Sequence, residues 1–191
     1  TYNSQKLSMS NASFSVAPAY YTGSEVTPEV TVTHSGKTLV KDRDFIVTYH
    51  NNIEPSSYYN SPWVGIDGIG NYQGYVTKSF TINRADISSC TVTLSDESLT
   101  YTGSSLRPTA TVKSGDKELT LNQDYYVSYR NNWDAGTASA ILTGTGNYTG
   151  SVTKDFTIKP LDSSRYSASL SQYSYTSDGT EKCPDVTVTY G

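Results

Sequence analysis

Residues 68–82 read GIGNYQGYVTKSFTI, and residues 144–158 read GTGNYTGSVTKDFTI. Each stretch places the pattern Gly-x-Gly-Asn-Tyr-x-Gly before a segment in which apolar and polar residues alternate. Alternation of this kind indicates a β-strand with one face against a core. The glycines indicate a tight turn that needs positive φ angles. The chain therefore contains two copies of one β-rich unit, offset by 144 − 68 = 76 residues.

The likeness between the copies extends toward their N-terminal sides, where the offset becomes 80 residues. The matched elements are Tyr21-Thr22-Gly23 with Tyr101-Thr102-Gly103, Pro28 with Pro108, Asp44 with Asp124, Tyr49 with Tyr129, and Asn51-Asn52 with Asn131-Asn132. The difference, 80 − 76 = 4, indicates four extra residues in the first copy after its Asn pair. Gly179 and Pro184 repeat the pattern a third time. We therefore predict one repeat at residues 1–83, a second at 84–160 and the start of an incomplete third at 161–191.

Inside each repeat, short alternating segments are separated by Gly, Asn and Ser, which favour turns. We find no apolar stripe with helical spacing. Tyrosine, threonine and serine are abundant, as is typical of strands. The residues predicted to be buried are Val30, Val32, Val47, Phe80 and Ile82 in the first repeat, and Ala110, Val112, Val127, Phe156 and Ile158 in the second. The predicted fold is all-β, with tandem immunoglobulin-like antiparallel β-sandwich repeats, although the Cys-Trp-Cys hallmark of antibody domains is absent.

The combined pattern resembles a known family of repeats. Tyr-Thr-Gly, Pro, Asp-aromatic, Tyr, Asn-Asn, Gly-x-Gly-Asn-Tyr-x-Gly and Thr-Lys-x-Phe-Thr-Ile together are similar to the glycine-rich, immunoglobulin-like repeats of Gram-positive (Firmicutes) extracellular surface proteins. The likeness covers residues 10–191. It implies an extracellular location, secreted or attached to the cell wall, and a role as a spacer or adhesive module. It carries over no catalytic or binding residue.

Charge and hydropathy argue against two classes of partner. The formal net charge is −4, and the chain has no run of Lys or Arg. Because nucleic-acid binding needs a basic surface, we do not expect it. The apolar stretches are too short to span a bilayer, so no membrane insertion is expected in this fragment. Thr1–Ser4 are polar and suggest no signal peptide, so we expect a mature or excised piece of a longer protein.

No catalytic, metal-binding or cofactor-binding residue is predicted, and we expect the protein not to be an enzyme. His34 and His50 do not recur in the second repeat, and no nucleophile and base are spaced for catalysis. Asp44 and Asp124 precede strand aromatics without the cluster of oxygen ligands that calcium needs. We predict instead that these two carboxylates cap turns, and that both Asn pairs end strands in turns bonded to nearby backbone.

The two cysteines are predicted to stay unlinked. Cys90 lies near the start of the second repeat, and Cys183 follows the opposite end of that repeat if the repeats run end to end. A disulfide needs Cα atoms within about 7 Å of each other. We therefore expect no bridge between Cys90 and Cys183 within one chain.

The insertion in the first repeat is the candidate binding site. Residues 53–63 read IEPSSYYNSPW, where the second repeat has the shorter WDAGTAS. Trp63 takes the place of Ser139, at a position that faces outward. Together with Tyr58 and Tyr59, it would stack on a sugar ring or anchor a protein partner. In the alternative, the loop folds these rings over its own end of the sandwich.

Three functions remain open from the sequence. The leading one is a non-catalytic extracellular stalk or adhesive module. The second is a carbohydrate-binding module that uses the aromatic insertion. The third is an adhesin that binds a protein on a host or neighbouring cell.

Overall fold

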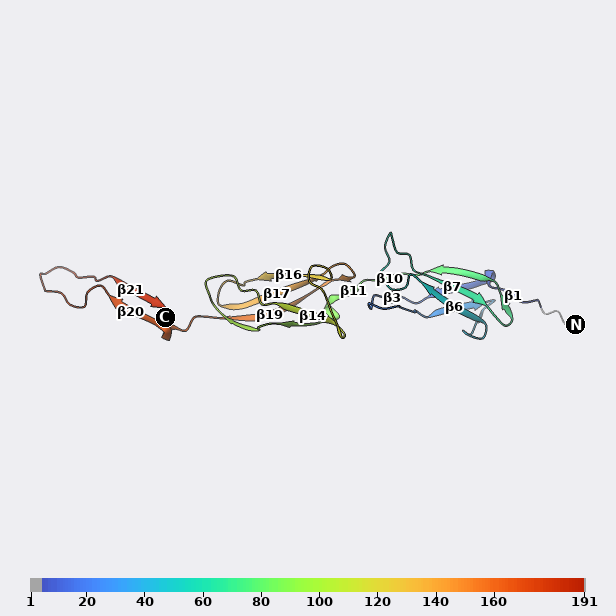
Figure 1. Ribbon diagram of the computed structural model, residues 1–191, viewed down its shortest axis with the longest axis horizontal. Helices are drawn as coiled ribbons and strands as arrows, with labels where there is room; N and C mark the ends of the chain where they lie inside the picture. Colours follow the sequence, from blue (N-terminus) through green and yellow to red (C-terminus); the bar gives the residue numbers. More distant parts are fainter. Residues whose placement is uncertain (1–4, 191) are drawn as a thin grey trace. The chain divides into compact units, whose positions relative to one another are not determined.

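A computed structural model describes residues 5–190 of the chain (Figure 1). In this part of the chain the structure is all-β, as predicted. The helical elements there are single 3-10 turns, namely η1 (Met9–Asn11), η2 (Ile87–Ser89) and η3 (Ser163–Arg165). No α-helix interrupts the strands among the described residues.

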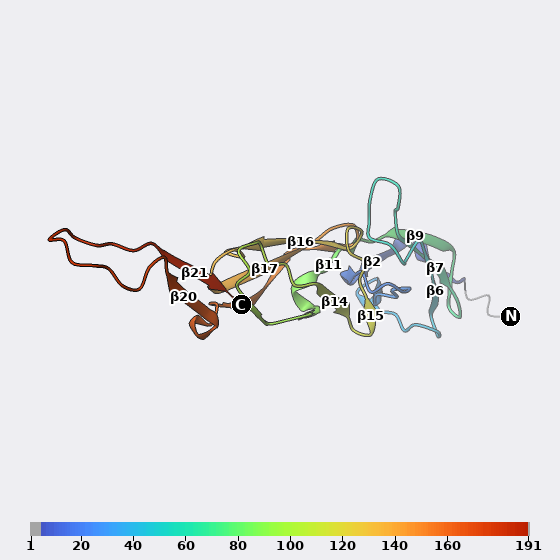
Figure 2. The ribbon, with the colours of Figure 1, turned by 60° about the vertical axis from the view of Figure 1, so that its left-hand side comes forward.

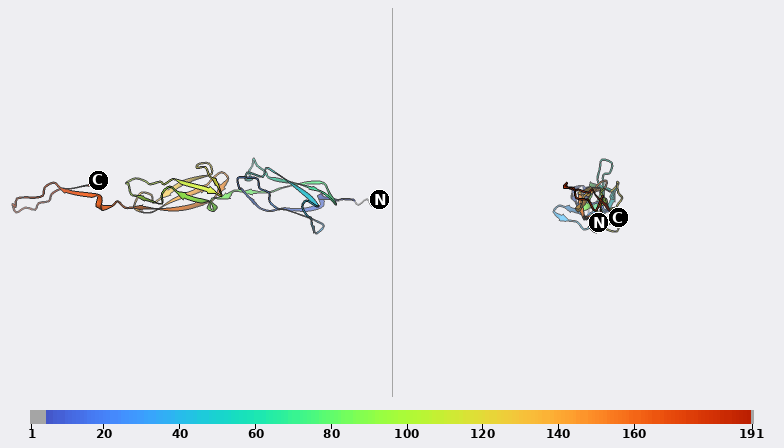
Figure 3. Two further views of the ribbon diagram at one scale, coloured as in Figure 1. Left: turned by 60° about the horizontal axis from the view of Figure 1, so that its bottom comes forward. Right: turned by 90° about the vertical axis from the view of Figure 1, so that its left-hand side faces the viewer.

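Two antiparallel sheets form the first repeat, whose strands are drawn in blue to green in Figures 1 and 3. Their strand orders are β2-β4-β5 and β6-β7-β9. Their strands are β2 (Ala12–Val16), β4 (Val30–His34), β5 (Lys37–Thr38), β6 (Phe45–His50), β7 (Trp63–Gly68) and β9 (Tyr75–Ser79). Val32 of one sheet and Val64 and Ile66 of the other are fully buried. The hydrophobic core therefore lies between the two sheets, in a sandwich-like arrangement.

The second repeat has corresponding strands in the same order, except that one long strand, β19, takes the place of β9 and β10. Its sheets have the orders β12-β14-β15 and β13-β19-β17-β16. The strands are β12 (Thr91–Leu94), β13 (Ser98–Thr100), β14 (Ala110–Ser114), β15 (Lys117–Glu118), β16 (Tyr125–Arg130), β17 (Gly136–Gly144) and β19 (Ser151–Lys159). β17 begins at Gly136, whereas β7 begins at Trp63, the counterpart of Ser139. The inserted loop of the first repeat thus replaces the start of this strand.

Each repeat also contains two short pairs of parallel strands. In the first repeat, β1 (Leu7–Ser8) pairs with β8 (Tyr72–Gln73), and β3 (Ala19–Tyr20) pairs with β10 (Ile82–Asn83). In the second, β11 (Ala85–Asp86) pairs with β18 (Tyr148–Thr149), and β13 pairs with the end of β19. In both repeats an early strand therefore lies parallel to the last one.

Contact density divides the chain into two compact units. One contains residues up to Val92 together with 111–127 and 142–152, and the other contains 93–110, 128–141 and 153–191. In the second unit, Ala138, Phe156 and Ile158 form a core cluster, packed by partly buried side chains that include Leu99 and Leu106. This division follows contacts rather than the sequence repeat, so the boundaries at residues 83 and 160 remain predictions.

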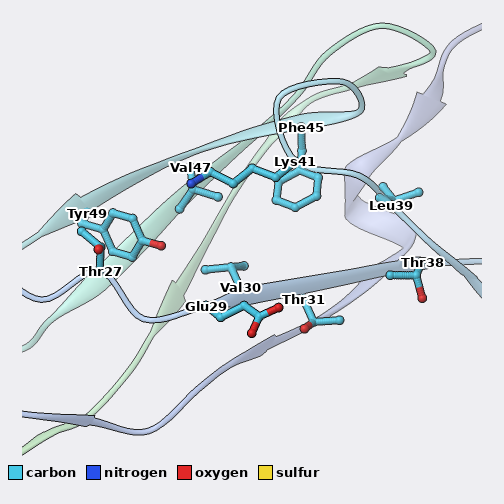
Figure 4. A pocket seen from close by; sticks show the side chains of 10 residues that line it. All are labelled: Thr27, Glu29, Val30, Thr31, Thr38, Leu39, Lys41, Phe45, Val47 and Tyr49. Atoms are coloured by element: carbon cyan, nitrogen blue, oxygen red, sulfur yellow. The ribbon is translucent and has the colours of Figure 1, made fainter.

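Seven of the ten residues predicted to be buried are buried, and three valines are only half-buried. These are Val30, Val47 and Val127. Val30 and Val47 line a cavity of about 260 Å³ between β4 and β6 (Figure 4). Packed sheets lie about 10 Å apart, and two short valine side chains do not fill that gap. Val127, the counterpart of Val47, is likewise half-buried.

The third repeat begins with an exposed strand pair. β20 (Tyr166–Leu170) and β21 (Val186–Tyr190) are antiparallel, with Ala168 opposite Val188. In the sequence, Val186 and Val188 alternate with Thr187, which predicts a strand with these valines on a half-buried face. That burial is wrong here, because they are 61% and 59% exposed. The strand forms as predicted, but a two-stranded sheet buries neither face unless a second layer covers it.

The same bonds from side chain to backbone recur in both repeats, and we call them the repeat framework. Its members are Tyr49 Oη donating to Pro28 O (2.7 Å), Tyr129 Oη to Pro108 O (2.6 Å), Asn52 Nδ2 to Val26 O (3.0 Å) and Asn132 Nδ2 to Leu106 O (2.9 Å). Asn51 and Asn131 hold positive φ angles of 55° and 54° directly after a strand. Asn51 Nδ2 also donates to Ser61 O at 3.3 Å, so the prediction of side-chain bonds to backbone at the ends of these strands is confirmed for Asn51, Asn52 and Asn132.

Candidate functional site

The inserted loop of the first repeat is held together by one asparagine. Asn60 Nδ2 donates to the carbonyls of Asn51, Glu54 and Pro55, the shortest of these bonds being 2.8 Å. Ser56 ties the loop to the last strand, because its N–H donates to Ile82 O and its Oγ accepts from Ile82 N. The loop, teal in Figure 2, projects from the strands, and these hydrogen bonds hold its base.

Tyr58 and Tyr59 lie at the outer part of this loop. Each is 93% exposed, and their rings meet edge to face with centroids 5.0 Å apart. The alternative in which the loop folds these rings over its own sandwich is therefore wrong. The two phenol rings form an exposed pair that contacts chiefly itself, on a loop with a defined hydrogen-bonded base.

Trp63 does not join this pair. It is the first residue of β7, and its ring stacks on that of His50 with centroids 3.9 Å apart and planes 9° apart. Its side chain points outward, as predicted, because the next residue, Val64, points into the core with no exposure. Among the described residues, no ring contact links Trp63 to Tyr58 or Tyr59. The three residues predicted as one site therefore separate into a loop pair and a sheet-face residue.

The sequence reasoning missed the neighbours of Trp63 on the sheet face. His50 lies opposite Trp63 on β6, and Tyr75 of β9 lies across Gly65 of β7. One signal was present in the sequence. Gly65 sits in the middle of a strand where the second repeat has Ile141, and an interior strand glycine often marks a close approach by another group.

The cavity between the sheets offers no catalytic arrangement. Its titratable side chains are Glu29, Lys41 and Tyr49 (Figure 4). The hydroxyl of Tyr49 already donates to Pro28 O, and burial raises the pKa of this phenol. At about 260 Å³ the cavity is also smaller than ordinary small-molecule sites. It accounts for the half-burial of two valines rather than for a binding function.

The two aspartates that precede strand aromatics cap turns, as predicted. Asp44 Oδ2 accepts from Val40 N at 2.9 Å, and Asp124 Oδ2 accepts from Thr120 N at 2.8 Å. Arg43 also donates to Asp44, through Nη2 at 2.8 Å. The bond from Arg43, followed by that from Val40, lowers the pKa of Asp44 from 3.8 to about 2.

This lowered pKa predicts a dependence of stability on pH. The folded state binds the Asp44 proton more weakly than the unfolded state, so the stabilisation is complete above pH 4 and is lost as the pH falls toward 2. In Asp44→Asn, the amide oxygen still accepts from Val40, but the charge is gone. We expect the melting temperature of the wild type to fall more steeply than that of the variant between pH 4 and pH 2. Parallel melting curves across this range would contradict the role of the charge.

The remaining reactive side chains form no cluster. Cys90 is partly buried, Cys183 is exposed, and both thiols are free, as predicted. His34 is the last residue of β4, where it is buried against Tyr72 with ring centroids 5.7 Å apart. Within residues 5–190, no three His, Cys, Asp or Glu side chains are grouped to hold a metal ion. The described residues also include no helix long and apolar enough to cross a membrane.

Comparison with protein-family models, with curated proteins and with solved structures found no match for this chain.

Proposed function

We propose that the chain is a non-catalytic, extracellular stalk or adhesive module of a bacterial surface or secreted protein. The extracellular location rests on the resemblance of its repeat motifs to those of Gram-positive surface proteins. The mechanical part of the proposal rests on one observation, the parallel pairing of an early and a last strand in each repeat.

The pairing in the second repeat is the more extensive one. Ser98, Leu99 and Thr100 of β13 lie opposite Thr157, Ile158 and Lys159 of β19. Two further bonds extend the contact, from Thr157 N to Glu97 O at 2.9 Å and from Tyr101 N to Lys159 O at 2.8 Å. In the first repeat, β3 and β10 pair in the same way, and Tyr21 N donates to Asn83 O at 2.8 Å.

This topology determines how a tensile load is distributed. A pull on the two ends of a repeat acts on the start of the early strand and on the end of the last strand. Because the strands are parallel, this pull slides them past each other and loads all their hydrogen bonds at once. A pull that peeled the strands apart would break the bonds one at a time. A repeat built in this way suits a spacer that transmits force between a cell surface and an attached module.

The proposal predicts that resistance to force depends on direction. In a background with Cys90→Ser and Cys183→Ser, handles at Asp96→Cys and Pro160→Cys pull β13 and β19 in shear. Handles at Thr102→Cys and Pro160→Cys pull the same strands apart from one end. Single-molecule force spectroscopy is expected to give a clearly higher unfolding force for the first pair. Equal forces in the two directions would contradict a load-bearing role for this pairing.

An adhesive contact through the inserted loop is a second candidate. It is favoured by the exposure of Tyr58 and Tyr59 on a loop that the hydrogen bonds of Asn60 stabilise. Its partner would be a glycan or a protein on a host or neighbouring cell. Substituting both tyrosines by alanine tests this candidate, because a contact made through the loop would be lost in that variant.

A further inference from the structure

The outward face of the sheet β6-β7-β9 carries an aromatic surface in the first repeat. Three cross-strand rows make up this face, in the order β6, β7, β9: His50, Trp63 and Ser79; Thr48, Gly65 and Thr77; Ile46, Asp67 and Tyr75. His50 and Tyr75 are exposed, the latter by 55%, and Trp63 is partly exposed. Aromatic and hydroxyl side chains therefore lie side by side in solvent.

Gly65 lies in the middle row of this surface, beneath the Tyr75 ring. A Cβ at Gly65 would overlap the Tyr75 hydroxyl, and would lie 2.8 Å from Tyr75 Cε2 and 2.7 Å from Thr48 Oγ1. The φ angle of Gly65 is not positive, so the strand itself does not require glycine here. Glycine is required here because the Tyr75 ring approaches the strand closely. This ring covers Gly65, which is buried.

The Trp63 ring has one covered side and one open side. His50, opposite Trp63 on β6, stacks on one face. The neighbour on the other side is Ser79 of β9, which is short and exposed, and we infer that the second face of the partly exposed indole is accessible. Trp63 and Gly65 are two residues apart on β7, which places their Cα atoms about 7 Å apart along the strand, and the Tyr75 ring lies over Gly65. The two rings can therefore contact one extended ligand.

The second repeat lacks this surface although it has the same framework. Its residues at the positions of His50, Trp63, Gly65 and Tyr75 are Arg130, Ser139, Ile141 and Ser151. There Ser139 Oγ donates to Asp155 Oδ1 at 2.7 Å, so a polar pair occupies the place of the indole. Since both repeats fold with the same strands, the aromatic surface is not needed to form the sheet.

We propose that Trp63, Tyr75 and Gly65 form a binding surface for a neutral, β-linked polysaccharide on the outward face of β6-β7-β9. The apolar C–H face of a pyranose ring matches an accessible indole or phenol ring. Thr77 and Ser79 supply hydroxyls at the same face for the hydroxyls of the sugar, whereas the Thr48 hydroxyl already lies 3.3 Å from His50 Nε2. The three rows contain no Lys or Arg, and their one carboxylate is that of Asp67, opposite Tyr75, so the face offers no Lys or Arg to pair with an acidic ligand. An apolar peptide would leave these hydroxyls without partners. The proposal does not depend on the role of the repeats as a stalk.

Affinity electrophoresis of the whole chain in gels containing hydroxyethylcellulose, galactomannan or glycogen tests the proposal. We expect retardation by at least one of the two β-linked polymers and none by the α-linked glycogen. Trp63→Ala and Tyr75→Ser are each expected to weaken this retardation about tenfold, as for other aromatic anchors at binding surfaces. Gly65→Ala is expected to do the same, because its methyl group displaces the Tyr75 ring, the mobile end of a flexible side chain.

Matched variants separate this surface from other exposed rings. Trp133→Ala removes the 58% exposed indole of the second repeat, and Tyr58→Ala with Tyr59→Ala removes the loop pair; both are expected to retain full retardation. Unchanged melting temperatures for Tyr75→Ser and Gly65→Ala establish that the loss is one of binding. The proposal is overturned if the wild type migrates freely in every gel, if glycogen retards it as strongly as the β-linked polymers, or if only the Tyr58 and Tyr59 variants lose retardation.

Discussion

Replacing Leu142 by alanine is expected to lower the free energy of unfolding of the second repeat by about 2–5 kcal/mol. Leu142 lies in β17 with no exposed surface. Removing most of its isobutyl side chain leaves a cavity in the core, because the packed side chains around it relax only partly into the space. Urea-induced unfolding, followed by circular dichroism, measures the loss.

Ile141 is the matched control for this change. It is adjacent to Leu142 on the same strand, has the same number of carbon atoms and points to the partly exposed opposite face. Ile141→Ala is expected to cost about 1 kcal/mol or less. Equal losses for the two variants would mean that β17 does not direct one face into the core.

The second large effect is expected from the framework asparagines. In Asn132→Ala, the carbonyl of Leu106 loses the donor that reaches it at 2.9 Å, and an unsatisfied buried acceptor costs about 1–3 kcal/mol. Asn52→Ala is expected to have a similar effect through Val26. Both variants keep the bond to the main-chain carbonyl of the substituted residue. Leu106 N donates to the carbonyl oxygen at position 132, and Val26 N to that at position 52, each at 2.8 Å. Thermal unfolding of each variant measures the contribution of the amide side chain alone.

The neighbouring asparagine provides the control. Asn131 has a φ of 54°, a conformation that glycine adopts without strain. Asn131→Gly is therefore expected to change the stability by less than about 0.5 kcal/mol. A loss as large as that of Asn132→Ala would show that the two members of the pair do not have separate roles.

Much of the fold could be predicted from periodicity and turn chemistry. The alternation around Val32, Val112 and Phe156 gave their strands and their burial correctly. Gly70 and Gly146 have the positive φ angles that the turn pattern required, whereas Gly68 and Gly144, the first glycines of the pattern, end strands β7 and β17. What periodicity could not give was the depth of burial. Val30 and Val47 have the correct parity, but their exposure depends on the separation of two sheets that the sequence does not encode locally.

The candidate site could be predicted only in part, for a related reason. A period of two places Trp63 on the outward face, but it does not say which side chains lie beside it on neighbouring strands. That information is the strand register, which pairs Trp63 with His50 and Ser79 across long sequence separations. The exposure of Tyr58 and Tyr59 depended on a loop conformation set by Asn60. No local pattern distinguishes such a loop from one that folds back on the sheet.

The repeat framework has a consequence for how tandem copies of a gene segment diverge. Its bonds from Tyr and Asn, like the capping bonds of Asp44 and Asp124, run from side chains to main-chain atoms rather than to other side chains. Val26 and Leu106 accept equivalent bonds, and Val40 and Thr120 donate them, although the side chains differ. After duplication, only the few codons that supply the donor and acceptor side chains are constrained by this framework. The outward positions are free to drift separately, and one copy can acquire a new surface while its sister copy preserves the ancestral architecture.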